Sequence, residues 1–585
     1  MFDYWVHVTN LASIYILLTV SLNLLVGYTG LFTVTHGALF GVGGYASALV
    51  AVHYGVPLLV AILVAIGATA VIGSVIALPS LRISGDYLVI ASIAIQVLMV
   101  AIFVNADRLT GGASGLAGIP QPAFLGWAAS TPISYLPLNI VGALVGLVLA
   151  VLLVRSPFGR TLRAIREDEV AAASLGKDIV RYKFIVYLIA SGMAGAAGSL
   201  YAYYISFIDP TSFGIDTSIL ILSMVIIGGA GTIRGSIIGP VFVVASMESL
   251  RFLQLPNDVV GPVRQAAYGL ALILFMLLRP QGLLGESVLG ITKRKAKRTA
   301  TRAVPAPTIG PAPSVGLVPN VGLVSNTALP SVRTIERPRA AELGADAVDG
   351  ADHPLLVCTD LVAGYNGHPV LHGLSMKVRA GEIVAVIGHN GAGKSTVLKS
   401  IVGLLAVDRG QVLLEGTDIT NRQSSLPASQ RIGLMPQSGG VFPAMTIQEN
   451  LITAGFMRRR TRLRHRIDEI FDLFPILAER KGQKAVNLSG GQQRTLALAM
   501  ALVPGHRVLL LDEPSIGLSP VLVESMLRTV QQISRELGIS VILSEQNVRP
   551  ALAIADRAYV LKTGRVHVED SAASLLERAD LWRLF

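Results

Sequence analysis

The apolar residues of this chain are concentrated in its first half. Residues 1–290 contain long runs without charged side chains, whereas residues 353–585 have the composition of an ordinary water-soluble domain. The chain of 585 residues is 52% hydrophobic and has a mean hydropathy of +0.61, which is more apolar than a soluble globular protein usually is. The sequence therefore predicts two environments, with the first half folded in a membrane and the second half in water.

Apolar runs of roughly 20 residues are long enough to cross a bilayer as helices. We expect about nine such spans, and eight or ten would also fit, because frequent glycine and alanine blur the boundaries. The predicted spans lie at about 10–27, 33–53, 57–79, 87–104, 137–155, 183–205, 215–230, 236–251 and 262–278. No basic segment precedes the first run, so we expect it to be kept as a span and not removed as a signal peptide.

Basic residues predict the orientation of these spans. The segment 155–183 is rich in arginine and lysine, and a second basic cluster follows the last predicted span at 293–302. Because cytoplasmic loops carry an excess of such residues, both segments are expected to be cytoplasmic, which puts the amino terminus outside. Basic clusters also bind nucleic acid. The position beside a span favours a membrane anchor here, so no nucleic-acid partner is expected.

Residues 291–352 are predicted to be a linker. After the basic cluster this segment is rich in proline, alanine, valine and glycine, and it has no helical or strand period. Such a composition favours a flexible, extended tether. We therefore expect a membrane domain at 1–290 and a soluble domain at 353–585. The one cysteine of the chain, Cys358, falls in an apolar run and is expected to be a small core residue.

The soluble half contains a phosphate-binding loop. Its sequence fits G-x-x-x-x-G-K-[ST], an apolar strand-like run (383–387) precedes it, and a helix-like run (397–401) follows it. Glycines let backbone N–H groups approach phosphate oxygens, the lysine reaches the β- and γ-phosphates, and the serine hydroxyl holds Mg²⁺. The expected phosphate-binding residues are Gly388, His389, Asn390, Gly391, Ala392, Gly393, Lys394, Ser395 and Thr396.

Two carboxylates end a second apolar strand-like run, Val508-Leu-Leu-Leu-Asp512-Glu513. Asp512 is expected to bind Mg²⁺, and Glu513 to orient and deprotonate the attacking water. A carboxylate pair on a buried strand is costly unless it has a role. The alternative is that one of them caps the following helix. The alternation of strand-like and helix-like runs over 353–585 predicts an α/β domain.

A further motif makes this half resemble the ATPase of an ABC transporter. Residues 488–494 read Leu-Ser-Gly-Gly-Gln-Gln-Arg, which is similar to that family's signature. The resemblance implies that the signature contacts ATP held by an opposing subunit, through Ser489, Gly490, Gly491 and Gln492. Gln437, in Met-Pro-Gln-Ser, is similar to the Q-loop glutamine, which senses Mg²⁺ and contacts the membrane domain, and it is assigned to the ATP and metal sites. Tyr365 is similar to the aromatic residue that stacks on adenine, or it is an ordinary half-buried aromatic.

Two departures from the family pattern concern hydrolysis. The segment 515–519 reads Ser-Ile-Gly-Leu-Ser in place of S-A-L-D, and Gln546 stands where a switch histidine is usual. Glutamine can donate a hydrogen bond to a phosphate but cannot titrate near neutrality. The runs 442–451 and 544–547 are similar to LivF-type ATPases of branched-chain amino acid importers, in which that glutamine is normal. Glu513 and Gln546 are therefore kept as the expected catalytic residues.

The membrane half resembles LivM-type permeases of the same importers, on the segments 21–30, 81–87, 109–115 and 228–235. Its cytoplasmic loop is similar to the coupling pattern E-A-A-x-x-x-G, with valine in place of the glutamate. A short helix of this kind docks on the ATPase; the alternative is an ordinary amphipathic loop. The residues assigned to this coupling helix are Glu169, Ala171, Ala172 and Gly176. Asn23 and His36, in or near spans, suit a translocation path or plain hydrogen bonding between helices.

The resemblance implies a polytopic α-helical permease fused to an α/β ABC ATPase in a bacterial inner membrane, using ATP and Mg²⁺. The implied partners are a LivH-like permease, a LivG-like ATPase and a substrate-binding protein outside; a homodimer is the alternative. Leucine, isoleucine and valine are the expected cargo, with urea and short amides as close competitors. An exporter, and an ATP-gated channel or nontransporting regulator, are the other functions considered.

Overall fold

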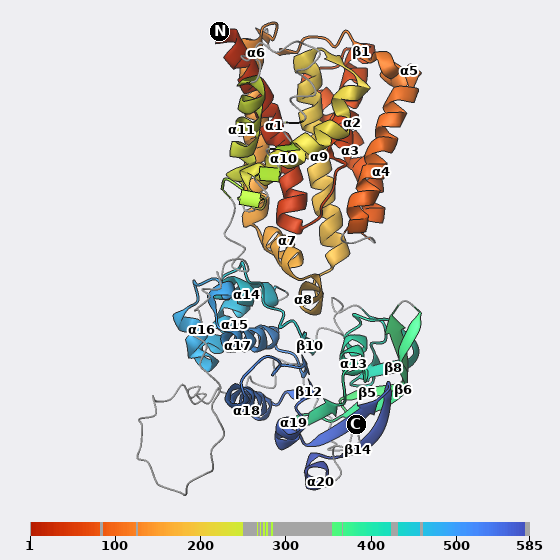
Figure 1. Ribbon diagram of the computed structural model, residues 1–585, viewed down its shortest axis with the longest axis vertical. Coiled ribbons are helices and arrows are strands. Elements are labelled where there is room, and N and C mark those ends of the chain that lie inside the picture. The colour runs from red at the N-terminus through yellow and green to blue at the C-terminus, as the bar shows by residue number, and fades with distance from the viewer. Residues whose placement is uncertain are drawn as a thin grey trace, which may run out of the picture.

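The computed structural model describes residues 2–81, 86–124, 127–249, 354–365, 367–422, 431–456 and 460–578, with a few isolated positions between 266 and 284. A helical domain lies at one end of the molecule and an α/β domain at the other, and the amino terminus is at the far end of the helical domain (Figure 1). The two domains meet through the short helices α7 (Pro157–Glu167) and α8 (Glu169–Ser174). The predicted fold class is confirmed.

Seven helices in the described part of the chain are long and apolar enough to cross a membrane, and a shorter apolar helix follows them. They match the first eight predicted spans; the ninth, 262–278, lies outside the continuously described residues. The helices are α1 (Phe2–Thr29), α2 (His36–Tyr54), α3 (Leu58–Ser80), α4 (Asp86–Asn105), α6 (Pro132–Arg155), α9 (Ile179–Ile205), α10 (Ile215–Gly228) and α11 (Gly235–Ser249).

The first helix begins well before the predicted start at about residue 10. Its first turns carry polar residues, which lowered the apparent hydropathy of this stretch. In the fold Nδ1 of one of them, His7, lies 2.6 Å from the hydroxyl of Tyr204 on α9, and Asn10, at the predicted start, donates hydrogen bonds to the carbonyl oxygens of Val6 and Pro132. These contacts satisfy the polar side chains inside the bundle, so the helix extends through them.

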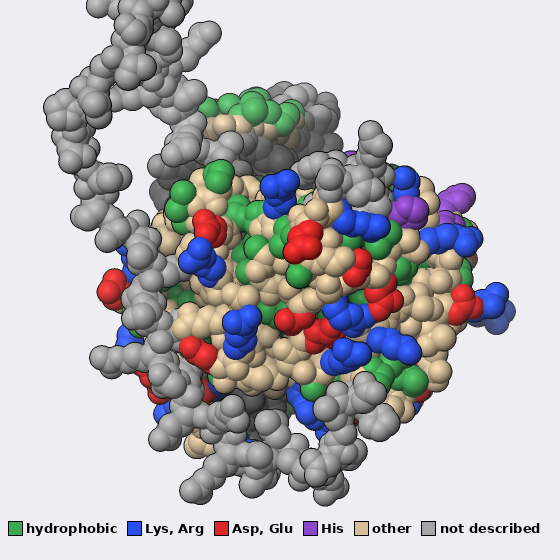
Figure 2. Space-filling view, turned by 90° about the horizontal axis from the view of Figure 1, so that it is seen from below, with side chains coloured by type: hydrophobic (Ala, Val, Ile, Leu, Met, Phe, Trp, Pro, Cys, Tyr) green, Lys and Arg blue, Asp and Glu red, His purple; other side chains and the backbone are tan. Residues whose placement is uncertain are grey.

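The apolar faces of α3, α4 and α6 are left exposed by the helical domain. Less than a third of the residues in their most apolar windows are buried. Exposed apolar surface of this extent is expected where a protein faces lipid. The exposed side chains include Leu63, Val71, Val75, Leu98, Val141, Leu144 and Leu152. By contrast, the end of the α/β domain carries interspersed acidic and basic side chains, as a surface in water does (Figure 2).

Short elements connect the helices at the two ends of the bundle. At the end away from the α/β domain, β1 (Leu116–Ala117) pairs with β4 (Phe207–Ile208), and β2 (Ala123–Phe124) pairs with β3 (Trp127–Ala128). The same end contains α5 (Asp107–Thr110), η1 (Gly112–Ser114) and η2 (Pro210–Phe213). The predicted connection 105–136 therefore lies on the side opposite α7 and α8.

Three helices approach one another closely at glycine. A Cβ added at Gly43 of α2 would lie 2.4 Å from the Cα of Gly195 on α9. A Cβ added at Gly195 would lie 2.2 Å from Oγ1 of Thr69 and 2.8 Å from the carbonyl oxygen of Ala65, both on α3. Small residues at such positions let helix backbones approach in a membrane protein.

Gly195→Ala is therefore expected to lower the free energy of unfolding by about 1–3 kcal/mol, because the new methyl group must push these helices apart. Thermal unfolding of the purified full chain in detergent measures the effect. The matched control is Gly67→Ala on α3, where an added Cβ meets nothing within 4 Å. Equal shifts in the two variants would contradict the close-packing account.

The α/β domain is built on two sheets. A six-stranded sheet has the order β10-β11-β12-β7-β13-β14, parallel except for the last pair, and a four-stranded antiparallel sheet has the order β6-β5-β8-β9. The strands are β5 (Leu356–Tyr365), β6 (His368–Val378), β7 (Ile383–Ile387), β8 (Val407–Leu414), β9 (Thr417–Asp418), β10 (Ile432–Met435), β11 (Val508–Asp512), β12 (Ser540–Glu545), β13 (Arg557–Lys562) and β14 (Arg565–Ser571).

Helices cover the six-stranded sheet and bury its central strands. Every residue of β7, β11 and β12 is buried, as the continuous apolar runs predict for parallel strands covered on both faces. Cys358 is buried in the second core of the domain, as predicted. The helices are α13 (Lys394–Ile401), α14 (Ile447–Ala454), α15 (Arg460–Leu473), α16 (Pro475–Glu479), η6 (Ala485–Asn487), α17 (Gly490–Leu502), α18 (Pro520–Leu537), α19 (Val548–Ile554) and α20 (Ala572–Glu577).

Candidate functional site: a phosphate loop and a coupling seam

The phosphate-binding loop joins the buried strand β7 to α13. Gly391 and Gly393 have φ angles of 82° and 102°, a left-handed conformation that glycine adopts at little cost. Gly393 caps α13, and a Cβ there would lie 2.9 Å from Leu371. The loop therefore needs glycine for both its conformation and its packing. The remaining predicted loop residues, His389, Asn390, Ala392 and Thr396, follow the same turn from β7 into α13.

Lys394 lies at the start of α13, and its side chain folds back over the loop. Its Nζ donates hydrogen bonds to the carbonyl oxygens of Gly388, at 2.8 Å, and His389, at 3.2 Å. The same ammonium lies 3.6 Å from Oε1 of Glu513. A cation is thus held between the loop and the end of β11.

Ser395 and Asp512 bring two oxygen ligands together. Ser395 Oγ donates a hydrogen bond of 2.9 Å to Oδ1 of Asp512 at the carboxyl end of β11. Burial raises the pKa of Asp512, and the hydrogen bond from Ser395 opposes that rise. A hydroxyl and a carboxylate beside a phosphate-binding loop are the hard oxygen donors that Mg²⁺ takes. The residues present therefore fit a magnesium ion.

Glu513 is the point where four segments converge. Its carboxylate accepts hydrogen bonds from Nε2 of Gln437, at 2.7 Å, and Nε2 of Gln546, at 2.8 Å, in addition to its contact with Lys394. Its φ angle is 48°, a conformation costly for a side chain larger than glycine, by roughly 1–3 kcal/mol. Backbone strain of this kind is concentrated at functional sites, which supports a role for this carboxylate.

Tyr365 lies at the end of β5, next to α13. Its ring is 42% exposed, and Nζ of Lys399 on α13 lies 5.9 Å from the ring centroid. An exposed aromatic face beside the helix that follows the phosphate loop can stack on a base. The structure thus brings Tyr365 close to the predicted phosphate-binding helix.

The signature residues lie elsewhere in the domain. Ser489 caps α17: its Oγ accepts a hydrogen bond from the backbone N–H of Gln492, whose side-chain oxygen accepts one from the N–H of Ser489. Gly490 and Gly491 open the helix, with nothing within 4 Å of a Cβ added at Gly490. Among the described residues no hydrogen bond joins this group to the phosphate loop, and α17 and α13 are well separated in Figure 1.

Two residues that the sequence analysis did not single out support the site. Arg494, on α17, donates a hydrogen bond of 2.9 Å to the carbonyl oxygen of Gln437, and burial lowers its pKa. Glu545, at the end of β12, accepts one of 3.0 Å from the N–H of Ser515, and burial raises its pKa. Both residues lie in motifs that the sequence analysis recognised, 488–494 and 544–547. A charged side chain inside such a motif was the signal that could have identified them as site residues.

Helix α8 packs against the α/β domain. Ala171 and Ala172 are fully buried, in the same apolar cluster as Met435 and Phe442. Gly176 ends this turn with a φ angle of 80°. The Glu169 carboxylate instead binds Nζ of Lys183 at 2.5 Å, within the helical domain. We call the contact of α7 and α8 with the α/β domain the seam. Of the predicted coupling residues, Ala171 and Ala172 lie in the seam, whereas Glu169 lies on the side of the helical domain.

Polar contacts that the sequence analysis did not assign hold the same seam. Glu167 accepts a hydrogen bond of 3.1 Å from the N–H of Ala444, and Asp168 accepts one of 2.9 Å from Oγ of Ser438. The preceding residue, Arg166, donates to the carbonyl oxygen of Gly27 at the end of α1. Consecutive residues of this loop thus contact the α/β domain on one side and a long helix of the helical domain on the other.

Asn23 and His36 make hydrogen bonds inside the helical domain. Asn23 donates to the carbonyl oxygen of Thr232, at 2.9 Å, and to Oγ of Ser236, at 2.7 Å. Nε2 of His36 lies 2.9 Å from Oγ of Ser21. Both side chains are buried. These contacts favour the structural alternative, hydrogen bonding within the bundle, over a place in a translocation path.

The two domains match two family models. Residues 4–279 match the permease component of branched-chain amino acid transport systems, and residues 371–516 match the ABC transporter model. Among curated relatives, the branched-chain amino acid transport ATP-binding protein BraG of Pseudomonas aeruginosa is 41% identical over 37% of this chain and 93% of its own length.

Two further relatives cover one half each. The probable branched-chain amino acid transport ATP-binding protein LivF of Archaeoglobus fulgidus is 39% identical over 39% of this chain and 98% of its own length. The branched-chain amino acid permease LivM of Escherichia coli is 32% identical over 48% of this chain and 69% of its own length.

The fold and the matches define an ABC transporter subunit in which a membrane-spanning permease domain and an ATP-hydrolysing domain share one chain. The domain at the carboxyl end binds ATP. Within that class, the chain belongs to the branched-chain amino acid transport family, as a LivM-type permease fused to a LivF-type ATPase. The predicted resemblance is confirmed.

Proposed function

We propose that this chain is the fused permease and ATPase subunit of an importer for branched-chain amino acids. The observation that carries the proposal is the seating of α8, on the cytoplasmic loop of a LivM-type permease, in the apolar core of a LivF-type ATPase. A rigid seam of this kind transmits ATPase movement to the spans. The domains are 1–290 and 353–585, joined by a linker at 291–352.

We infer an orientation in a bacterial inner membrane with the ATPase domain in the cytoplasm. The basic segment 155–183 and the seam lie at the same end of the bundle, which agrees with the excess of basic residues in cytoplasmic loops. The amino terminus, at the opposite end, then faces the outside. Lipid covers the exposed apolar faces of α3, α4 and α6.

The chemistry proposed for the ATPase site follows from its geometry. Lys394 binds the phosphates of ATP, and Ser395 and Asp512 hold Mg²⁺, with Gln437 beside them. A bound Mg²⁺ neutralises phosphate charge. Glu513 accepts the proton of the attacking water, while Gln546, 2.8 Å from that carboxylate, holds it in place.

A second ATPase subunit completes the site in this proposal. Ser489 and Gly490 are exposed, Gly491 and Gln492 are half-buried, and among the described residues no hydrogen bond joins them to the phosphate loop of their own chain, so they are available to ATP bound by a partner. We propose a LivG-like ATPase and a LivH-like permease as those partners, with a substrate-binding protein outside. ATP then favours the closed pair of ATPases, and hydrolysis releases it.

Uptake of labelled leucine, with labelled urea in parallel, tests the cargo. The assay uses cells that lack their own system and receive this chain with its partner subunits. Leucine uptake at least tenfold above that of cells with the Lys394→Ala chain is expected, because that variant loses the phosphate-binding cation. Urea uptake instead would replace the cargo and keep the mechanism. Uptake of neither would favour an exporter, and uptake unaffected by Lys394→Ala would favour a channel.

A further inference from the structure

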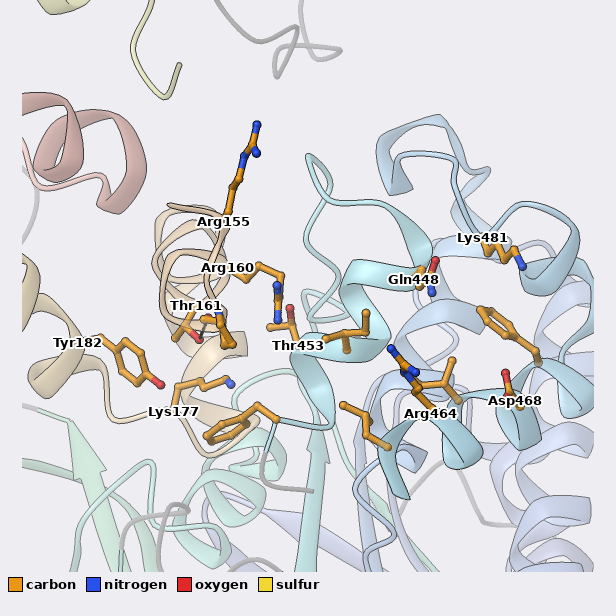
Figure 3. A pocket seen from close by; sticks show the side chains of 16 residues that line it. Arg155, Arg160, Thr161, Lys177, Tyr182, Gln448, Thr453, Arg464, Asp468 and Lys481 are labelled. Atoms are coloured by element: carbon orange, nitrogen blue, oxygen red, sulfur yellow. Dashed lines mark hydrogen bonds between the residues drawn. The ribbon is translucent and has the colours of Figure 1, made fainter. Parts of the chain in front are cut away.

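A cleft separates the permease from the ATPase domain beside the seam. It lies between α7, with the end of α6 and the turn before α9, on one side, and α14 and α15 on the other (Figure 3). Its volume is about 870 Å³. The cleft is distinct from the nucleotide site, because none of its lining residues belongs to the phosphate loop or to the strand ends around it.

The charge of this cleft is strongly one-sided. Five cationic side chains line it, against a single carboxylate, that of Asp468. The cations come from both domains: in Figure 3, Arg155, Arg160 and Lys177 lie on one side of the cleft, and Arg464 and Lys481 lie on the other. Like charges gathered around one cavity repel one another, so an anion placed among them is stabilised by all of them.

Lys177 gives the cleft a buried amine, which an anion in the cleft would hold in its charged form. Its side chain is almost fully buried, and Nζ lies 2.9 Å from the centroid of the Phe456 ring, across the seam. Burial, and to a smaller extent the neighbouring charge of Arg160, lower the pKa of Lys177 to about 6. A charged amine is costly in such a place unless an anion compensates it. The excess of basic residues in cytoplasmic loops concerns side chains in water, so it does not explain why Lys177 is buried.

The position of the cleft matches the surface of a membrane. Arg155 is the last residue of α6, one of the helices that are long and apolar enough to span a bilayer. Apolar and aromatic side chains, among them Ile452, Phe456 and Phe471, complete the wall on the ATPase side. A basic cleft with an apolar wall at this level suits a ligand that carries both a phosphate and an apolar part.

We propose that this cleft binds a phosphate-bearing ligand between the permease and the ATPase domain. An anionic phospholipid headgroup and a soluble phosphate compound share the chemistry that the cleft recognises. Arg155, Lys177 and Arg464 supply cations from both domains. Because the ligand bridges the two walls, its binding favours the arrangement of the domains that keeps the walls at this separation. Binding of the lipid or metabolite at this cleft, outside the nucleotide site, is thereby coupled to movement of the ATPase domain.

The test measures ligand binding by calorimetry, using the full chain with its partner subunits in detergent. ADP and Mg²⁺ are saturating, so that the nucleotide site is filled. The probes are short-chain phosphatidylglycerol, short-chain phosphatidylcholine with the same acyl groups, and inorganic pyrophosphate. Tight binding of phosphatidylglycerol alone identifies a lipid headgroup, and tight binding of pyrophosphate alone identifies a soluble ligand. No binding of either overturns the proposal.

Matched variants assign the binding to the cleft. Lys177→Gln and Arg464→Gln are each expected to weaken binding about tenfold, the loss of roughly one charge-assisted contact. The controls are Arg181→Gln and Arg462→Gln, which remove exposed charges of the same segments that do not line the cleft, and they should change affinity less than about twofold. Equal losses in cleft and control variants would overturn the proposal. Arg464 is exposed, so its variant remains decisive if Lys177→Gln loosens the seam.

Discussion

Replacement of Glu513 by glutamine is expected to lower ATP hydrolysis by about 10²- to 10³-fold while ATP still binds. The carboxylate lies at the end of β11, where Gln437, Gln546 and Lys394 converge on it. Glutamine keeps the shape of the side chain but cannot accept a proton from water. Steady-state release of phosphate measures hydrolysis, and a fluorescent ATP analogue measures binding.

The control for this variant is Glu524→Gln on α18, an exposed carboxylate that pairs with Arg528 four residues later. Such a surface pair contributes little, so hydrolysis should stay within about twofold of the unchanged chain. Hydrolysis that survives Glu513→Gln would show that another group activates the water. The assignment of Gln546 as a catalytic residue in place of the usual switch histidine would then lose its support, because Gln546 acts by holding the Glu513 carboxylate.

Ala171→Glu is expected to lower transport at least tenfold and to leave basal ATP hydrolysis within a fewfold. Ala171 is fully buried between α8 and the ATPase core, and a Cβ added at Gly440 would lie 3.6 Å from its methyl group. A carboxylate there has no partner and costs several kcal/mol to bury, so the seam opens. Uptake and phosphate release, measured on the same preparation, separate the two activities.

Val170→Glu is the matched control, since it introduces the same side chain one residue earlier on α8. Val170 is 48% exposed, so the new carboxylate can stay in water. Transport by this variant should remain within about twofold. If both variants lose transport equally, then the buried face of α8 has no special role, and the amphipathic-loop alternative gains support.

The fold was predictable because each half of the chain has a strong periodic signal. Long uncharged runs predicted eight of the helices now described, and continuous apolar runs predicted the buried strands β7 and β11. The start of α1 was predicted wrongly by about eight residues. Hydropathy counts a polar side chain such as His7 against a span, whereas the fold places it within hydrogen-bond distance of the Tyr204 hydroxyl on another helix.

The nucleotide site was predictable in its parts but not in its assembly. The motifs identified Lys394, Asp512 and Glu513, because phosphate and metal chemistry need these residue types at fixed spacing. They did not indicate that Gln437 and Gln546 both donate to the Glu513 carboxylate, which depends on how distant strands pair. Arg494 was overlooked for the same reason, since its contact with the Gln437 carbonyl is a tertiary one.

The seam was the least predictable region. The coupling pattern located α8 and its two buried alanines, but it also assigned Glu169, which binds Lys183 within the permease. The hydrogen bonds of Glu167 and Asp168 to the ATPase domain depend on the orientation of one short helix against another domain. Sequence spacing alone does not specify which side of so short a helix faces its partner.

The most direct test of the central claim is accumulation of labelled leucine by vesicles that contain the full chain with its partner subunits. ATP is enclosed in the vesicles, and leucine with the substrate-binding protein is supplied outside. The account predicts that leucine accumulates against its gradient only with enclosed ATP, and that Glu513→Gln in this chain abolishes the accumulation. Leucine that enters equally fast without ATP, or with the Glu513→Gln chain, would contradict an importer powered by this ATPase domain.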